Sequence, residues 1–206
     1  MSILPMSQTP DKKSEIVNSG IAKIILASQS PRRKQLLEWA EIPFEIIIQS
    51  TDESFPANLP SDEIAIHIAR NKALAVKAIQ QSEQIILAAD TIVVLNNEVI
   101  GKPKDRDDAI AILSKLSGQK HTVITGVVIL HSGNEIAFAD TTAVEFHNLT
   151  KGQIIFYVDK YKPYDKAGAY AIQEWIGVVG IKSVTGDFYN VMGLPVSRVV
   201  QALLKL

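Results

Sequence analysis

The segment at residues 28–33, Ser-Gln-Ser-Pro-Arg-Arg, carries the first side chains along the chain that could bind an anion. It lies between an apolar run and a helical pattern, and serine followed by proline is typical of the start of a helix. Free amides at such a start, the hydroxyl of Ser28 and the guanidinium groups of Arg32 and Arg33 together favour a phosphate. A capped helix with solvated arginines explains the same residues, and the glycines of a Walker loop are missing.

Asp90 is a carboxylate inside an apolar run that extends from residue 85 to residue 95. The run has the character of a buried strand, in which an unpaired charge is costly. Asp90 therefore needs a metal ion, a cation or several hydrogen-bond donors beside it, and carboxylates in such settings concentrate in active sites. A structural salt bridge would satisfy the same need.

Two lysines and an acidic pair complete the set of candidate residues. Lys72 lies in a long helical pattern, and Lys102 lies in a Gly-Lys-Pro loop. A lysine can hold a phosphate as a mobile point charge. Asp52 and Glu53 follow the second predicted strand and, with Asp90, would offer oxygen ligands for Mg²⁺ or Mn²⁺. Taken singly, each of these residues is equally typical of a solvated surface.

The elements that must position these residues alternate between strands and helices, which predicts an α/β protein. Apolar runs predict strands at residues 23–27, 44–49, 84–95, 98–100, 121–130, 135–146 and 178–184. Helices are expected to begin at Ser30-Pro31, Ser61, Asp105 and Thr150, and near Pro195. Because antiparallel hairpins stand among the strand–helix units, the sheet is predicted to be mixed and twisted, with helices flanking it.

The composition narrows the classes of protein and of chemistry. The 206 residues contain 21 basic and 22 acidic side chains, so a nucleic-acid polymer is not the expected partner. Cysteine is absent, which excludes disulfides, thiolate metal sites and thiol nucleophiles. The four histidines lack the spacing of metal ligands and are predicted to be structural or surface residues.

The chain is predicted to hold one domain. No apolar run approaches the roughly 18 residues of a membrane-spanning helix, so no membrane partner is expected. Residues 1–20 mix prolines, polar residues and lysines, and we interpret them as a flexible N-terminal tail that fits no signal peptide. Residues 21–206 show no linker and no shift in composition, and are expected to form the single domain.

Seven motifs in order, from about residue 24 to the last residue, resemble the Maf family of nucleoside triphosphate pyrophosphatases. They are Ser28-x-Ser30-Pro31-Arg32-Arg33, Asp52-Glu53, Ala69-Arg70-x-Lys72-Ala73, Ala89-Asp90-Thr91-Ile92-Val93, Gly101-Lys102-Pro103, Asp165-Lys166-Ala167-Gly168-Ala169-Tyr170-x-Ile172-Gln173 and Val191-x-Gly193-Leu194-Pro195. The segment from Asp165 to Gln173 looks like that of the subgroup acting on dTTP and UTP.

The resemblance implies a fold of the inosine-triphosphate pyrophosphatase type, with two lobes around a cleft. It implies metal-dependent hydrolysis of dTTP, UTP and modified pyrimidine nucleotides to the monophosphate and pyrophosphate. Nucleotide preference would depend on Arg32, Thr91 and Gln173. Gln173 suits this role because its amide offers a donor and an acceptor to the N3–H and carbonyl that uracil and thymine share.

The predicted chemistry of the other candidates agrees with this reaction. Cleavage of the α–β phosphoanhydride bond needs a base for the attacking water, and Asp90 matches the base of the family motif. Mg²⁺ or Mn²⁺ would be held by Glu53 and Asp90. The triphosphate would be held by Ser28, Arg33, Lys72 and Lys102.

Three readings of the function stay open from the sequence, and one of them is a preference for another modified nucleotide, because Ala171 stands where the family motif has glycine. The other two differ in the need for catalysis. The first is an enzyme that removes surplus or modified pyrimidine nucleotides, which places it in the cytoplasm. The second is a nucleotide-binding regulator of cell division and septum formation that needs no catalysis. An intact Asp90 with both lysines favours the enzyme, because a pure binding protein does not need a base. A homodimer is implied by the family resemblance alone.

Overall fold

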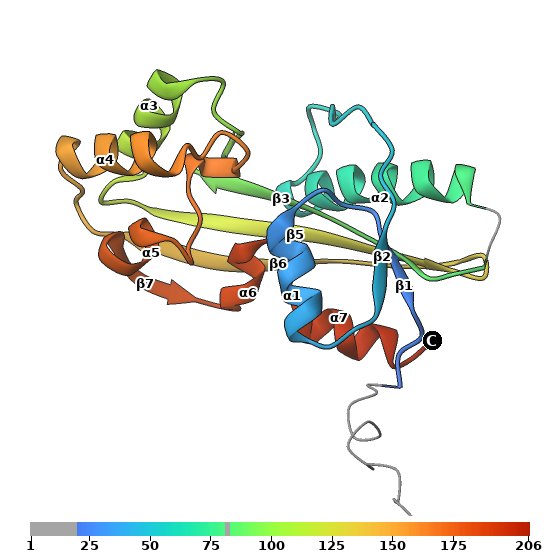
Figure 1. Ribbon diagram of the computed structural model, residues 1–206. Coiled ribbons are helices and arrows are strands. Elements are labelled where there is room, and N and C mark those ends of the chain that lie inside the picture. The colour runs from blue at the N-terminus through green and yellow to red at the C-terminus, as the bar shows by residue number, and fades with distance from the viewer. Residues whose placement is uncertain (1–19, 81–82) are drawn as a thin grey trace, which may run out of the picture.

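The computed structural model of the protein describes residues 20–80 and 83–206 (Figure 1). Seven strands form one mixed sheet in the order β2-β1-β3-β5-β6-β7, with β4 paired to β3. The strands are β1 (Ile24–Leu26), β2 (Phe44–Ile46), β3 (Ile86–Leu95), β4 (Glu98–Ile100), β5 (Lys120–His131), β6 (Asn134–Phe146) and β7 (Ile181–Thr185). The predicted tail at residues 1–20 lies, apart from Gly20, outside the described residues.

Helices lie on both faces of the sheet, as Figure 1 shows. Helix α2 covers one face, α1 and α7 lie on the other, and α3 and α4 pack together toward the opposite end of the sheet. The helices are α1 (Pro31–Trp39), α2 (Ser61–Ile79), α3 (Arg106–Leu116), α4 (Lys151–Tyr161), η2 (Ala167–Ala169), α5 (Trp175–Gly180), α6 (Phe188–Met192) and α7 (Val196–Leu203). The predicted mixed α/β sheet flanked by helices is confirmed.

The register of the sheet brings Asp90 opposite Gly126. Strand β1 pairs in parallel with β2 and β3, whereas β3, β5, β6 and β7 pair antiparallel. A Cβ on Gly126 would lie 2.3 Å from the backbone of Ala65 in α2. Glycine therefore lets α2 approach the sheet closely beside Asp90.

The core lies on both faces of the central strands. One cluster of buried side chains fills the space between the sheet and α2, and includes Ile25, Ala69, Val76, Ile86 and Val128. A larger cluster on the other face joins β3 and β5 to the remaining helices. Both faces of β3 and β5 are thus buried, as the long apolar runs of the sequence predict.

Several predicted helix starts are confirmed at the level of single hydrogen bonds. Ser30 accepts a hydrogen bond from the Arg33 amide, Asp105 accepts one from the Asp108 amide, and Thr150 forms a full capping box with Gln153. Ser61 does not cap α2, because it lies inside the helix and Pro60 occupies the cap position.

One expectation near the C-terminus is wrong and one is confirmed. A strand was expected at residues 178–184, but residues 178–180 belong to α5 and pairing starts at Ile181. The amides of Gly177 and Val178 bond to the Glu174 carbonyl and close a helical turn, which overrides the weak strand preference of valine. The last helix was expected to begin near Pro195, and α7 confirms this start with Pro195 at its N-cap. The short helix α6 precedes it and ends where Gly193 adopts a φ of 117°.

Strand β2 ends at Ile46, three residues before the end of the predicted segment 44–49. Its parallel partner β1 ends at Leu26. The Ile47 amide still bonds to the Leu26 carbonyl, but β1 offers no carbonyl to the residues that follow Ile47. Residues 48–51 then leave the sheet and line a cavity.

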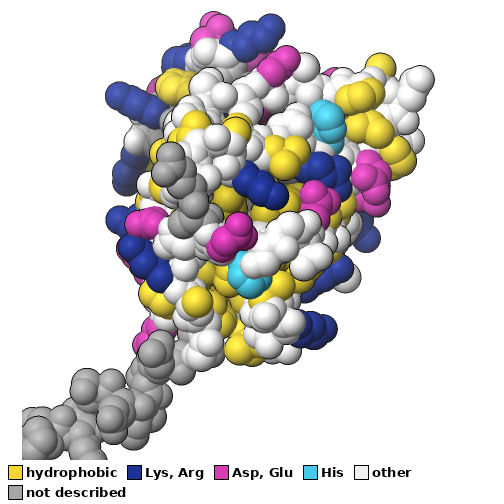
Figure 2. All heavy atoms as spheres, turned by 90° about the vertical axis from the view of Figure 1, so that its right-hand side faces the viewer, with side chains coloured by type: hydrophobic (Ala, Val, Ile, Leu, Met, Phe, Trp, Pro, Cys, Tyr) yellow, Lys and Arg dark blue, Asp and Glu magenta, His cyan; other side chains and the backbone are white. Residues whose placement is uncertain are grey.

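The surface gives no sign of one dominant charge on the face seen in Figure 2, where basic and acidic side chains are interspersed. This mixture agrees with the near-balanced composition. Within residues 20–80 and 83–206, no helix is long and apolar enough to cross a bilayer.

Candidate active site

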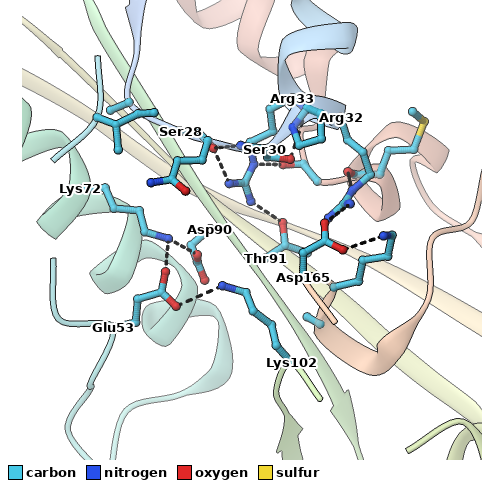
Figure 3. Close-up of a pocket in the computed structure, with 18 of the residues that line it drawn as sticks. Ser28, Ser30, Arg32, Arg33, Glu53, Lys72, Asp90, Thr91, Lys102 and Asp165 are labelled. Carbon is cyan, nitrogen blue, oxygen red and sulfur yellow. Dashed lines mark hydrogen bonds and ion pairs between the residues drawn. The ribbon is translucent and has the colours of Figure 1, made fainter. Parts of the chain in front are cut away.

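A cavity of about 440 Å³ opens beside the carboxyl end of β1, where the strand order of the sheet changes direction. Its volume falls in the usual range for small-molecule sites, roughly 300–1,000 Å³. Of the residues that the sequence singles out, those that line it are Ser28, Arg32, Arg33, Glu53, Lys72, Asp90, Thr91 and Lys102 (Figure 3). Gln173 is exposed and does not line this cavity.

Lys72 joins two carboxylates on one side of the cavity. Its Nζ atom lies 2.6 Å from Oδ1 of Asp90 and 2.7 Å from Oε1 of Glu53. Lys102 approaches the other oxygen of Glu53 at 3.4 Å. These side chains come from α2, from β3 and from loops after β2 and β4, and they point toward one another in Figure 3.

The charges of this group stabilise one another. The Asp90 side chain is only 13% exposed, so Lys72 supplies the cation that a buried carboxylate needs. Burial raises the pKa of Glu53, but Lys72 and Lys102 lower it more strongly, and the net effect is a pKa below the usual value. Glu53 therefore stays an anion at neutral pH.

The carboxylate pair also fits one common way of binding a divalent cation. Among the described residues no group of three or more Asp, Glu, His or Cys side chains could hold a metal ion. Mg²⁺, however, is often held by one or two carboxylates together with the phosphates of a substrate. Glu53 and Asp90, joined through one lysine, provide such a pair.

Arg33 ties three segments of the chain together beneath the cavity. Its guanidinium donates to the Gly193 carbonyl at 2.7 Å, to the Ser28 hydroxyl at 3.0 Å and to the Thr91 hydroxyl at 2.9 Å. Burial lowers the pKa of Arg33 to about 10, so it remains cationic at neutral pH. Three of its five N–H groups are thus used inside the protein, and a role as a phosphate ligand stays a prediction.

Arg32 points to a different part of the cavity. It donates to the Met192 carbonyl at 3.3 Å and to Oδ2 of Asp165 at 3.2 Å. The other oxygen of Asp165 accepts from Lys166 at 2.7 Å. Burial raises the pKa of Asp165, but Lys166 and Arg32 lower it more strongly. The net effect is a pKa below the usual value.

Asp165 and Lys166 line the cavity, although no individual role was predicted for either residue. The available signals were their place at the start of the motif from Asp165 to Gln173 and two adjacent charges in a loop before a short helix. A charge pair in a loop is usually solvated, and the motif by itself does not say which of its residues contact a ligand.

Tyr170 forms part of the cavity wall and is fixed from behind by a histidine. Its hydroxyl lies 2.8 Å from Nε2 of His121, which is 2% exposed and stacks on Phe146. Burial lowers the pKa of His121 to about 4, and its Nδ1 atom has no hydrogen-bond partner among the described residues. The prediction that His121 is structural agrees with this position in the core.

Several relatives that share one name cover most of this chain. A "dTTP/UTP pyrophosphatase" of Parabacteroides distasonis is 48% identical over 88% of this chain and 94% of its own length. Proteins of the same name from Cytophaga hutchinsonii and Bacteroides thetaiotaomicron are 50% and 45% identical, over 89% of this chain and 84% and 96% of their own lengths. The structure of the Staphylococcus aureus Ham1 protein covers 89% of this chain and 98% of that chain, at 18% identity and a TM-score of 0.47.

The family profile described as "Maf-like protein" matches residues 23–206. This range contains every strand and helix of the described structure and every residue that lines the cavity. With nine-tenths of its length inside that match, the chain belongs to the Maf-like protein family.

Proposed function

We propose that this protein hydrolyses dTTP and UTP to the nucleoside monophosphate and pyrophosphate, with the cavity as its active site. The relatives that bear the name "dTTP/UTP pyrophosphatase" support the reaction and the substrates. The observation that carries the proposal is Asp90, a largely buried carboxylate held at 2.6 Å by Lys72 on the cavity wall.

In this proposal different residues of the cavity supply the base and the cations that hydrolysis needs. A water molecule must attack the α-phosphorus, and a base must take its proton as the bond forms. Asp90 would be this base. The negative charge that grows on the departing pyrophosphate needs cations, and Lys72 and Lys102 lie beside Asp90 and Glu53.

Without a nucleotide, the two lysines of this group are paired with carboxylates, and a triphosphate would have to replace some of these pairs. Lys72 and Lys102 are now paired with carboxylates, so a phosphate must compete with Glu53 for the same two ammonium groups. Because Glu53 is 46% exposed, its side chain can turn away without opening the core. A freed Glu53 would then be available to a cation that accompanies the phosphates.

The proposed cofactor is Mg²⁺ or Mn²⁺, held by Glu53 and Asp90 together with phosphate oxygens of the substrate. When bound, such an ion would neutralise phosphate charge and help to ionise the attacking water. The residues of the chain would still orient the nucleotide, because Ser28 and the residues at the start of α1 line the same cavity.

Nucleotide preference is expected to depend on Arg32 and Thr91, both of which line the cavity. Gln173 lies outside its lining, so its role in base recognition stays a prediction that rests on the family motif. We further propose that the protein acts in the cytoplasm, where its nucleotide substrates are found, and that it forms a homodimer. Light scattering of the purified protein tests the dimer.

Product identification tests the proposed function directly. Purified protein with Mg²⁺ or Mn²⁺ should convert UTP to UMP and dTTP to TMP, with one pyrophosphate released for each. Release of inorganic phosphate alone would show cleavage at the terminal bond and would overturn the proposal. Tight nucleotide binding without any turnover would favour the regulator of cell division instead.

A further inference from the structure

Arg32, Asp165 and Lys166 form a row on the cavity wall in which a hydrogen-bond donor, an acceptor and a second donor follow one another. Asp165 is in the middle, with the Arg32 guanidinium on one carboxylate oxygen at 3.2 Å and the Lys166 ammonium on the other at 2.7 Å. All three line the cavity. In Figure 3, Arg32 and Asp165 lie on the side away from Lys72 and Glu53. The cavity therefore has a second charged group, separate from the proposed phosphate and metal end.

The exposure of this row favours recognition of a ligand. Asp165 is 56% exposed, whereas Arg32 is 20% and Lys166 only 9% exposed. The two cations therefore support the carboxylate from the sides, and the acceptor is the most accessible member. Its lowered pKa keeps it ionised, and so acceptor-only, at neutral pH.

Each member of the row retains hydrogen-bonding capacity. A guanidinium has five N–H groups, and Arg32 uses two of them for Met192 and Asp165. An ammonium has three, and Lys166 uses one at 2.7 Å for Asp165, with Glu174 at 3.8 Å. A carboxylate has about four lone-pair sites, of which two are taken. A ligand edge could thus meet a donor, an acceptor and a donor in order.

We propose that Arg32, Asp165 and Lys166 recognise the pairing edge of the pyrimidine base. Uracil and thymine present a carbonyl, an N3–H and a second carbonyl along this edge, which is the exact complement of the row. The N3–H would donate to Asp165, and the two carbonyls would accept from Arg32 and Lys166. The inference rests on the proposed function, because it places a nucleotide in the cavity, and it assigns recognition to two residues that the sequence motifs leave without a role.

The same row would disfavour cytosine. Cytosine presents an acceptor at N3 and an amino donor beside it, so N3 would face the Asp165 carboxylate and the amino group would face a cation. The first contact sets two acceptors against each other and the second sets two donors against each other, so neither forms a hydrogen bond. The 5-methyl group of thymine lies off this edge, so uracil and thymine satisfy the row equally well.

A buried network holds the row in position from behind. The Tyr157 hydroxyl donates to Glu174, accepts from the Ala171 amide and is fully buried. Burial and Glu174 raise the pKa of Tyr157 well above its usual value, so the hydroxyl remains a donor. Glu174 in turn faces Lys166. The ammonium group is therefore oriented by the core, which gives the row the rigidity that base recognition needs.

The experiment compares UTP, CTP and 3-methyl-UTP as substrates of the wild-type protein, Asp165→Asn and Asp159→Asn. Asp159 is a matched control, because it pairs with Arg106 on the surface and does not line the cavity. The wild type and the control should prefer UTP over CTP and over 3-methyl-UTP, which lacks the N3–H. Asp165→Asn should reduce the preference for UTP over CTP by about 10- to 100-fold, the effect of one mispaired group.

A binding measurement separates this inference from the proposed function. Calorimetry with UMP, CMP and 3-methyl-UMP needs no turnover, so the row is tested even if no nucleotide is hydrolysed. Selective binding of UMP that Asp165→Asn abolishes supports the row in either case. Equal use of UTP and 3-methyl-UTP by the wild type, or an unchanged preference in Asp165→Asn with its far-ultraviolet circular dichroism intact, would overturn it.

Discussion

Lys72 of helix α2 donates a 2.6 Å hydrogen bond to Asp90 of strand β3, and so joins a helix on the face of the sheet to the one charged residue of the strand. The bond is possible because Gly126, opposite Asp90 in β5, lets the helix backbone lie against the sheet. One short contact between helix and sheet thus places the proposed base beside a cation.

Asp90→Asn should keep the fold and lose turnover. Asparagine retains an oxygen that can accept from Lys72, and Glu53 remains as a second partner of that lysine. The amide cannot take a proton from water, so kcat should fall by about 10²- to 10⁴-fold while nucleotide binding persists. Steady-state kinetics and calorimetry measure the two effects. Undiminished kcat would remove Asp90 from the base role.

Glu53→Gln should weaken the response to metal. If Glu53 supplies a carboxylate oxygen to the divalent ion, its loss should raise the half-saturating Mg²⁺ concentration by roughly 10- to 100-fold. Activity at saturating Mg²⁺ should recover in large part. Glu98→Gln is the control, because Glu98 pairs with Lys115 on the surface. Identical metal titrations for the two variants would mean that Glu53 is not a ligand.

Arg33→Lys tests whether this guanidinium positions the loops of the site. A lysine cannot reproduce three divergent hydrogen bonds to Ser28, Thr91 and Gly193. The free energy of unfolding should fall by about 1–3 kcal/mol, with a loss of kcat. Urea denaturation measures the first effect, and Arg106→Lys provides an exposed control. A variant with unchanged stability and only weaker triphosphate binding would identify Arg33 as a phosphate ligand instead.

His121 should make the folded state sensitive to acid. Its pKa is about 4 when buried, against roughly 6.5 in an unfolded chain, so only the unfolded state binds a proton in between. Stability contributed by the neutral ring is complete above about pH 6.5 and declines as the pH falls toward 4. Between about pH 7 and pH 5 the loss should be about 2 kcal/mol.

The variants His121→Gln and His147→Gln separate this effect from general acid denaturation. Urea denaturation at both pH values should show a smaller pH-dependent loss in His121→Gln than in the wild type. His147 is exposed, so its variant should follow the wild type. If all three proteins lose the same free energy, burial of His121 does not govern the acid response.

Local signals were enough to predict most elements of this fold. A serine, aspartate or threonine before a helical pattern located three helix starts, because capping depends on residues within one turn. Long β-branched runs located β3 and β5, since both faces of these strands are buried. The prediction failed at residues 178–180, where a run of the same kind is helical and Val178 is 81% exposed.

The candidate site could be predicted as a set of residue types but not as a geometry. Asp90 was singled out because a charge in an apolar run is unusual, and Lys72 and Lys102 because a lysine can hold a phosphate. Asp165 and Lys166 lacked such a signal, since a pair of charges in a loop is ordinary. Their importance depends on Arg32, which is 133 residues away from Asp165 in the chain.

By itself the sequence determined which residues could do chemistry and which short elements carry them, because capping, periodicity and charge burial act over a few residues. The tertiary structure alone decided which of them meet. Arg33 and Gly193 are 160 residues apart and lie within 2.7 Å, whereas Gln173 lies outside the cavity lining that its motif neighbours Asp165 and Lys166 share. Such distances follow from strand order, register and close helix packing, which are properties of the whole core and not of any local segment.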